Sequence, residues 1–212
     1  MRLIREACVE TLAQCMTAEQ KGADRLELCA DLHLDGLTPS IALIKKVQAQ
    51  VNIPIRVMIR PRAGDFNYSA TELATMKQSI SECKLLGVDG VVFGVCKGGA
   101  LDLDAIGELA EVSQPLKVVI HKAIDTCDDP LAELQKLMEL GKIDGILTSG
   151  KCKTAFEGMV LLQQMQALAG DKLELIACGK VTDQNLEALS KQLPVRAWHG
   201  KLIVGELGSD SH

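Results

Sequence analysis

Aromatic side chains are scarce in this chain of 212 residues, which has one Trp, one Tyr and three Phe. Its net charge is -5, so it lacks both the stacking rings and the basic surface of a nucleic-acid groove, and we expect no nucleic-acid partner. No run approaches the roughly 18 consecutive apolar residues that a membrane span requires. The N-terminus, MRLIREACVE, carries charges where a signal peptide is apolar. We therefore expect a cytoplasmic, soluble protein with no membrane partner.

The usual cysteine motifs are also missing. The chain has eight cysteines, but no C-x-x-C and no H-x₃-H spacing occurs. Without a secretion signal, cysteines in a chain of this length are expected to be reduced thiols rather than a disulfide scaffold. Most of them are expected to behave as small hydrophobic side chains.

A repeated pattern is present instead, in which a helical stretch stops at a glycine and a short apolar run follows. It occurs as KGADRLEL, LGVDGVVFG and LGKIDGILTSG. Glycine just past a helix end supplies the left-handed C-cap, and the apolar run suits a strand that is covered on both faces. The pattern predicts eight strands, at 3–8, 24–29, 54–60, 89–94, 117–121, 144–148, 173–178 and 195–199. It predicts helices at 11–21, 39–50, 70–86, 103–113, 129–140, 153–169 and 182–192.

Strict alternation of strands and helices predicts parallel pairing with right-handed crossovers. Eight such units close most simply into a TIM-like (β/α)₈ barrel, an α/β fold, formed by residues 1–212 as a single domain. A doubly wound open sheet is the alternative, although its G-x-G-x-x-G marker is absent. After Trp198 the tail GKLIVGELGSDSH is too short for a full last unit, so the last helix is expected to be truncated or missing. The barrel wall is then either open there or covered by a second subunit, as in a homodimer.

Two predicted strands repeat an E-x-C arrangement, with Glu6 and Cys8 on the first and Glu27 and Cys29 on the second. Residues i and i+2 of a strand share a face, so each strand places its carboxylate and thiol on the same side. Neighbouring strands lie about 4.8 Å apart, so the two thiols could reach one soft ion, and two thiolates suit Cu(I). Zinc would require further ligands. The alternative is two buried thiols without a ligand.

Other polar residues are predicted at the carboxyl ends of the strands, where barrel enzymes hold their sites. One hypothesis is an enzyme of unknown reaction, in which His121 with Glu6 or Glu27 transfers protons and Arg60 holds a small anionic metabolite. The alternatives are an internal salt-bridge cluster, a hydrogen-bonded core histidine, or a non-catalytic interaction protein. The candidate catalytic residues are Glu6, Glu27, His121 and Asp125, and the candidate anion-binding residues are Arg60, Arg62, Asp65, Lys122 and Ser149.

Several motifs resemble those of the CutC-like copper homeostasis proteins: EACVE, GADRLELC, DGLTPS, IRPRAGDFNYS, GVDGVVFG, HKAID and ILTSG. The resemblance covers about the first 150 residues. It implies a TIM-like barrel, a cytoplasmic location and Cu(I) binding through Cys8 and Cys29. It also implies a polar pocket, matched here by Glu6, Glu27, Arg60, Arg62, Asp65, His121, Asp125 and Ser149. The chain departs from the family pattern at Ala63, Lys122 and Ile124, at ACGKV after the seventh strand, and in the shortened region after the eighth. Lysine at 122 keeps the charge of an arginine but loses its bidentate fork.

Overall fold

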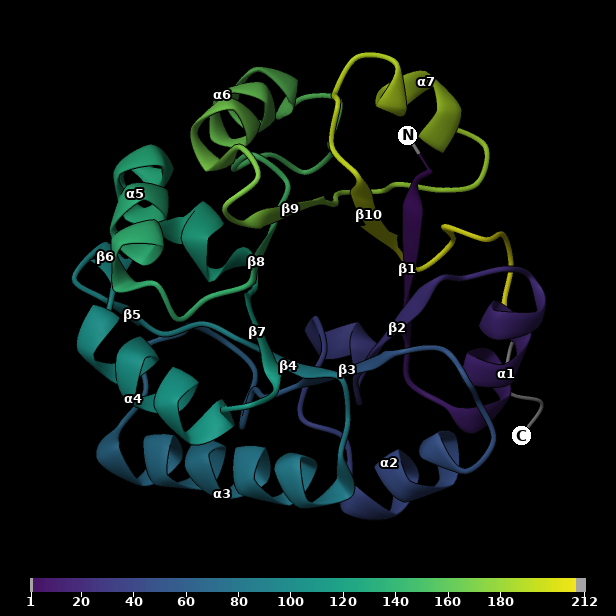
Figure 1. Cartoon of the computed structure of the whole chain (residues 1–212), viewed down its shortest axis with the longest axis horizontal. Coiled ribbons are helices and arrows are strands. Elements are labelled where there is room, and N and C mark those ends of the chain that lie inside the picture. Colours follow the sequence, from purple (N-terminus) through teal and green to yellow (C-terminus); the bar gives the residue numbers. More distant parts are fainter. Residues whose placement is uncertain (1, 209–212) are drawn as a thin grey trace.

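The computed structural model describes residues 2–208, and its centre is a closed barrel of eight parallel strands. The strands are β1 (Ile4–Val9), β2 (Arg25–Leu28), β3 (Ile55–Met58), β4 (Gly90–Phe93), β7 (Lys117–Ile120), β8 (Gly145–Thr148), β9 (Glu174–Ala177) and β10 (Ala197–Gly200). All eight coincide with predicted strands, and the open doubly wound sheet is excluded. Figure 1 shows the strands as a ring inside a ring of helices.

Of the two alternatives for the barrel wall, the open one is excluded, because the first and last strands pair directly. Four residue pairs join β1 to β10, from Ile4 with Ala197 to Ala7 with Gly200. Hydrogen bonding between strands therefore runs around the whole circumference without help from another chain. The sequence could not show this closure, since periodicity along one strand says nothing about its partner.

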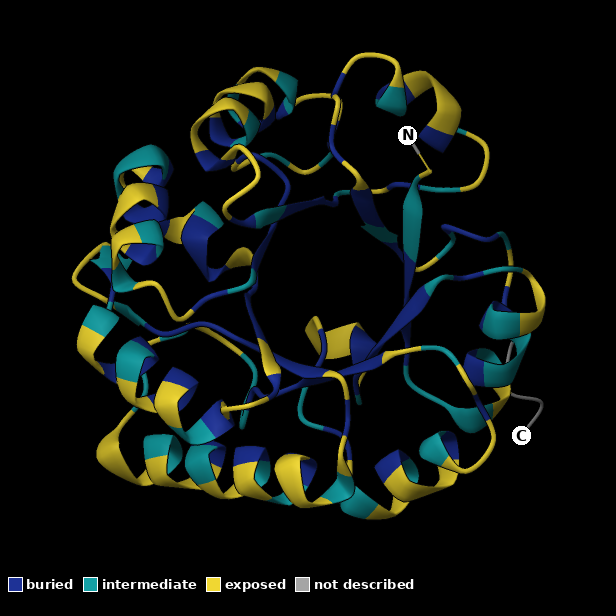
Figure 2. Cartoon of the chain, viewed as in Figure 1, coloured by how far each residue is buried: buried dark blue, intermediate teal, exposed yellow. Residues whose placement is uncertain are grey.

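Seven α-helices and two short 3₁₀ segments surround the barrel among the described residues. They are α1 (Leu12–Gln20), α2 (Ile41–Gln48), α3 (Ala70–Leu86), α4 (Leu103–Ser113), α5 (Pro130–Leu140), α6 (Met159–Ala169) and α7 (Leu186–Ser190), with η1 (Leu32–Leu34) and η2 (Lys122–Thr126). A small antiparallel hairpin, β5 (Cys96–Lys97) with β6 (Ala100–Leu101), follows β4. Figure 2 shows the helices buried toward the barrel and exposed outward, as amphipathic helices on a barrel must be.

Local sequence signals explain where most helices begin and end. Ser69 and Glu72 form a complete capping box at the start of α3, and Gly87 ends that helix with a φ of 72°. Two helices begin later than predicted. The helix predicted at 39–50 begins at Ile41 after the Ser40 cap, and the helix predicted at 182–192 begins after Asn185. The predicted helix at 153–169 begins only at Met159, because residues 151–158 form turns.

No eighth helix follows β10 within residues 201–208. Instead, Ile203 and Val204 are buried, and Leu202 forms a bridge with Thr182. The Glu206 carbonyl accepts a hydrogen bond from Lys21 Nζ at the end of α1. This extended segment thus covers part of the space that an eighth helix would occupy. No helix of the described residues is long and apolar enough to cross a bilayer.

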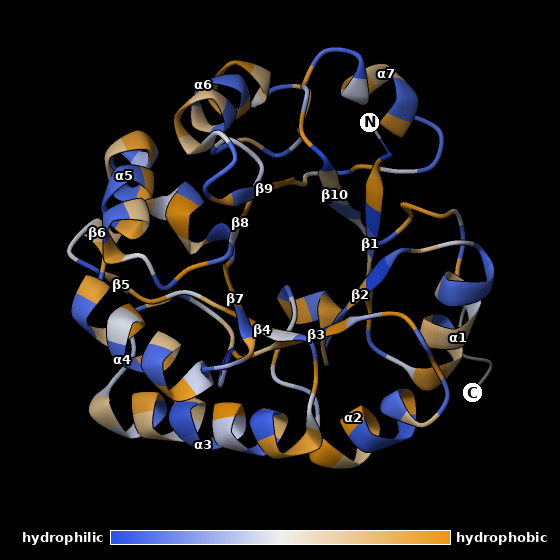
Figure 3. Ribbon diagram, in the orientation of Figure 1, coloured by the Kyte–Doolittle hydropathy of each residue, from blue (hydrophilic) through white to orange (hydrophobic). Residues whose placement is uncertain are grey.

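Strand residues alternate between an outer layer, packed on the helices, and the barrel interior. In β4, Val91 and Phe93 belong to the outer cluster and Val92 to the inner one. The inner cluster is apolar on most strands, with Met58, Val119, Leu147 and Ile176 among its members. On β1 and β2 hydrophilic residues interrupt it, as the blue segments of Figure 3 show. Further charged or polar residues, Arg56, Glu174 and His199, join them from the adjacent strands β3, β9 and β10.

Candidate functional site

The two E-x-C strands bring their carboxylates and thiols together inside the barrel. Cys8 Sγ lies 3.6 Å and Cys29 Sγ 3.5 Å from the same oxygen, Oε2 of Glu27. Cys8 and Glu27 are direct neighbours in the register of β1 and β2, and Cys29 follows β2 immediately. All three side chains are buried, with 6%, 1% and 2% exposure for Cys8, Cys29 and Glu27. Both thiols therefore face one point, as the sequence pattern predicted.

A histidine that the sequence analysis missed completes this cluster. His199, on β10, places Nε2 3.7 Å from Glu27 Oε2 and Nδ1 2.9 Å from Glu6 Oε1. One potential ligand atom from each of Cys8, Glu27 and His199 lies within 4.8 Å of the other two. The signal that could have found it is simple. His199 ends a predicted strand, but only barrel closure makes that strand a neighbour of the first.

The cluster holds several acidic protons in a buried space. Burial raises the pKa of Glu27 to about 8, although the nearby His199 charge opposes this shift. A hydrogen bond from Cys29 lowers the pKa of Cys8 despite its burial, and the same bond raises the pKa of Cys29. Burial alone would lower the pKa of His199, but the charge of Glu27 and hydrogen bonds to Cys8 and Glu6 raise it. A metal cation would replace these protons as the counter-charge for the sulfurs.

Glu6 does not join the thiols but anchors a layer of ion pairs beneath them. Its Oε2 lies 2.5 Å from Arg25 Nε and 3.4 Å from Arg56 Nη1. Burial alone would raise the pKa of Glu6, but Arg25, His199 and Arg56 outweigh it and lower the value from 4.5 to about 2. Glu174 Oε2 lies 3.1 Å from both arginines. The predicted neighbours Glu6 and Glu27 thus differ in role, one as a paired carboxylate and the other as a proton carrier.

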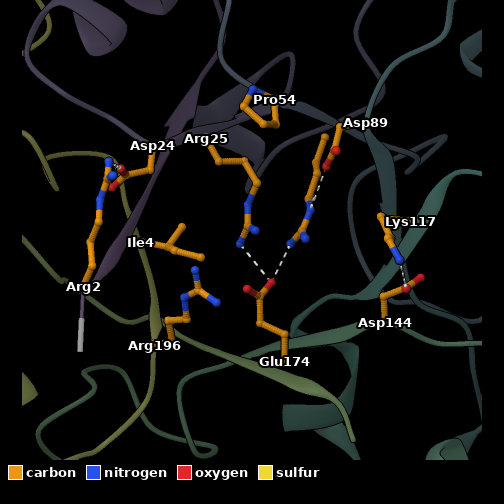
Figure 4. A pocket seen from close by; sticks show the side chains of 11 residues that line it. Arg2, Ile4, Asp24, Arg25, Pro54, Asp89, Lys117, Asp144, Glu174 and Arg196 are labelled. Carbon is orange, nitrogen blue, oxygen red and sulfur yellow. Dashed lines mark hydrogen bonds and ion pairs between the residues drawn. The ribbon is translucent and has the colours of Figure 1, made fainter. Parts of the chain in front are cut away.

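A cavity of about 490 Å³ opens at the other end of the barrel. Its lining comes from residues at the amino ends of strands, including Arg25, Arg56, Lys117 and Glu174. Figure 4 shows Arg25 reaching toward the Glu174 carboxylate and Lys117 toward Asp144. These charges neutralise one another, and sites in barrel enzymes lie at the opposite face. We therefore interpret this mouth as the ionic floor of the barrel.

Arg60 holds a segment that covers the thiols. Its guanidinium donates hydrogen bonds to the carbonyls of Leu34, Gly36 and Gly64, and lies over the Phe66 ring at 5.2 Å. Leu32, at the start of η1, packs in the same interior cluster as Cys8 and Cys29. Its carbonyl accepts a hydrogen bond from Lys201 Nζ, at 3.1 Å. The Arg60 guanidinium, predicted to bind an anion, thus contacts backbone carbonyls.

The hydrogen bonds and packing contacts of His121 involve residues other than the two glutamates. Its Nδ1 accepts a hydrogen bond from Ala123 N, its ring packs on Phe66 with centroids 4.6 Å apart, and its Nε2 has no hydrogen-bond partner within the described chain. Burial, then the Arg60 charge, lowers its pKa to about 3, so the ring is neutral at physiological pH. No hydrogen bond or ion pair of residues 2–208 joins it to Glu6 or Glu27.

Asp125 and Ser149 organise the loop after β8. The Asp125 carboxylate accepts hydrogen bonds from Thr148 Oγ1, from Ser149 N at 2.9 Å and Oγ at 3.0 Å, and from Lys151 N at 3.1 Å. All these donors belong to one short segment. Asp125 thus ties η2 to that segment.

The remaining candidates lie on the surface. Arg62 pairs with Asp65 and Glu72, at 3.0 Å and 2.5 Å, and its guanidinium lies over the Tyr68 ring at 5.1 Å. Lys122 is exposed. The structure therefore brings Cys8, Cys29 and Glu27 together at one point. It distributes Arg62, Asp65 and Lys122 over the surface loops.

Comparison with known proteins identifies the family of this chain. The model of the CutC family matches residues 3–204. The chain is 40% identical over 187 residues to the copper homeostasis protein cutC homolog of Homo sapiens, covering 88% of this chain and 68% of that protein. It is 39% identical over 195 residues to the family protein CutC of Glaesserella parasuis, covering 92% and 80%. The crystal structure of CutC from Streptococcus agalactiae superposes with a TM-score of 0.89 at 30% identity, covering 95% of this chain and 99% of that one. The chain, with its closed barrel and paired E-x-C strands, belongs to the CutC family.

Proposed function

We propose that this protein binds one Cu(I) ion through the thiolates of Cys8 and Cys29 and takes part in copper homeostasis. The observation that carries the proposal is the convergence of both sulfurs on Glu27 Oε2, at 3.6 and 3.5 Å. Thiolate sulfur is a soft ligand that selects Cu(I) over hard cations. The names of the human and bacterial relatives support the same ligand.

His199 extends the ligand set beyond the two thiols. Imidazole suits copper as a ligand, and a bound ion would replace the protons that the ligands release. Glu6 contacts His199 Nδ1, so the ring keeps Nε2 toward Glu27 and the sulfurs. The ligand set of two sulfurs and one nitrogen favours a soft monovalent ion.

The covering segment provides the dry surroundings that such a site needs. Leu32 and the barrel residues Met58, Ile176 and Ala197 surround the thiols. Exclusion of water protects bound Cu(I) and thiolates from oxidation, whose rate follows exposure. We also infer a reducing, cytoplasmic location, because all eight cysteines are free.

Anaerobic titration with Cu(I) against a competing chelator tests this function. We expect saturation near one equivalent for the wild-type protein and loss of tight binding in the Cys8→Ser, Cys29→Ser double variant. Cys152→Ser is the matched control, because Cys152 lies in a surface turn away from the barrel interior. Circular dichroism checks that each variant is folded. Equal affinity of the folded double variant and the wild type would refute the proposal.

A further inference from the structure

A second pair of cysteines lies outside the proposed copper site, on the loops at the carboxyl end of the barrel. Cys96 begins the β5–β6 hairpin and Cys127 directly follows η2. Both sulfurs contact one backbone oxygen, the carbonyl of Ala123, at 3.6 Å from Cys96 and 3.5 Å from Cys127. The two sulfurs thus meet at one oxygen atom, although 31 positions separate the two cysteines in the sequence.

Backbone hydrogen bonds hold the two segments together. Asp128 N donates to Gly99 O at 2.8 Å, which fixes the end of η2 against the hairpin. Cys96 N donates to Phe66 O, also at 2.8 Å. The sulfurs therefore meet through a preformed arrangement of three loops.

The two thiols differ in access. Cys96 is partly exposed and lines a cavity of about 310 Å³, together with Asp65, Lys97 and Thr126. Cys127 lies behind it with 1% exposure. A reagent that enters the cavity reaches Cys96 first, and Cys127 can react only with what Cys96 has bound.

Electrostatics adds to this asymmetry. The hydrogen bond from Cys127, then that from Thr126, lowers the pKa of Cys96 to about 7, although burial and the charges of Glu133 and Asp65 oppose the shift. Cys127, as the donor, has a raised pKa, which burial raises further and Lys151 opposes. A thiol whose pKa lies near the ambient pH combines thiolate population with nucleophilicity, which is the optimum for disulfide exchange.

We propose that Cys96 and Cys127 form a redox-active thiol pair that reacts with low-molecular-weight disulfides such as glutathione disulfide. The Cys96 thiolate attacks one sulfur of the disulfide, which forms a mixed disulfide on Cys96 and releases one thiolate. Cys127 then attacks Cys96 Sγ, which forms the Cys96–Cys127 bond and releases the second half as a thiol carrying the Cys127 proton. The two cysteines are oxidised and the small disulfide is reduced to two thiols.

The first step changes the state of the second cysteine. The hydrogen bond to the Cys96 thiolate is the largest cause of the raised pKa of Cys127. Once Cys96 is in a mixed disulfide it carries no charge, so Cys127 loses that stabilisation of its protonated form. Oxidation of the entry thiol therefore activates the resolving thiol.

Intact-mass analysis and peptide mapping after incubation of the reduced full chain with glutathione disulfide test the proposal. We expect the wild type to form an internal disulfide that maps to Cys96 and Cys127. The Cys127→Ser variant should stop at a mixed disulfide on Cys96, and Cys96→Ser should form no adduct at Cys127. Cys152 is the internal control, since it is also partly exposed but its thiol forms no hydrogen bond within residues 2–208.

A second measurement compares two cysteines within the unmodified chain. Iodoacetamide should alkylate Cys96 of the wild type faster than Cys152 at pH 7, with a half-maximal rate near that pH. In Cys127→Ala the pH of half-maximal rate should move upward, because the thiol donor is removed. Wild-type protein in which Cys96 reacts no faster than Cys152, or whose oxidation products lack the Cys96–Cys127 disulfide, would overturn the proposal.

Discussion

The same isosteric substitution should have opposite effects at two buried glutamates of neighbouring strands. Glu6 and Glu27 are both almost fully buried, on β1 and β2. We predict that Glu6→Gln lowers the free energy of unfolding of the metal-free protein at pH 7, whereas Glu27→Gln raises it. The reason is that Glu6 is held as an anion by arginines and Glu27 is held as a neutral acid by burial.

The magnitude at Glu6 follows from its pKa, lowered from 4.5 to about 2. This shift corresponds to about 3 kcal/mol of stabilisation of the ionised form. Glutamine cannot supply it, and it leaves Arg25 and Arg56 with less negative charge in a buried site, a change that typically costs about 3–5 kcal/mol. Because the folded pKa is depressed, this contribution is present above pH 4.5 and is lost as the pH falls toward 2.

The sign reverses at Glu27, whose pKa is raised from 4.5 to about 8. The folded state binds a proton that the unfolded state releases above pH 4.5, so stability present below that pH is lost as the pH rises toward 8. At pH 7 this loss amounts to about 3 kcal/mol. Glutamine resembles the protonated acid and needs no proton, so Glu27→Gln should recover up to this amount.

Urea-induced unfolding, followed by circular dichroism at pH 7 and pH 5, measures both effects. In a thermal melt of a chain of this size, the same change of about 3 kcal/mol in the free energy of unfolding would shift the melting temperature by about 6–12 °C. The deficit of Glu6→Gln should persist at pH 5, whereas the gain of Glu27→Gln should shrink to below about 1 kcal/mol. Glu187→Gln is the control for the substitution itself. It removes an exposed pair with Lys191 and should leave the unfolding curve unchanged.

Shifts of the same sign at Glu6 and Glu27 would refute this reasoning. An increase in the free energy of unfolding of Glu27→Gln that is equally large at pH 5 and pH 7 would also refute it. Such an increase would not depend on pH and so could not come from proton uptake by Glu27 on folding.

Two further predictions concern the loops at the carboxyl end of the barrel. Gly94→Ala should destabilise the protein by about 1–3 kcal/mol in urea unfolding, because the new Cβ would lie 2.7 Å from Ala123 Cβ. Gly107→Ala is the control: it lies inside α4 with no close contact and should stabilise the protein by about 0.5–1 kcal/mol. Equal effects of these two changes would contradict the packing argument. Asp125→Asn should cost about 1–3 kcal/mol and increase hydrogen exchange at the Ser149 amide, since an amide group can replace only one of the two accepting oxygens; unchanged exchange there would show that the carboxylate does not order this segment.

The sequence predicted the strands well because their signals are local. A glycine with positive φ ends a helix, and an apolar run follows within a few residues, as at Gly87 and Gly141. The start of α6 was misplaced for a physical reason. Residues 151–158 form turns in which Lys151 has a φ of 60° and Gly158 packs against the Ser149 carbonyl. Neither feature can be read from the helical spacing of apolar residues in the segment.

The sequence also predicted the convergence of Cys8, Cys29 and Glu27, because residues two apart share a face of a strand and consecutive parallel strands are adjacent. It missed Arg25 and Arg56 as partners of Glu6, because attention to strand carboxyl ends passed over charges at the amino ends. It grouped Arg60 and His121 with the glutamates, whereas the structure shows them in contact with Phe66 and loop carbonyls.

What the sequence by itself determined is the alternation of elements and the face on which each strand side chain lies, since both follow from the period of the backbone and from nearby residues. Only the tertiary structure decided that β10 pairs with β1, and thereby that His199 lies beside Glu6 and Glu27. It also decided that Cys96 and Cys127 share one carbonyl oxygen. These are contacts between residues distant in the chain, and their geometry depends on closure of the barrel and on loop packing, which no local pattern encodes.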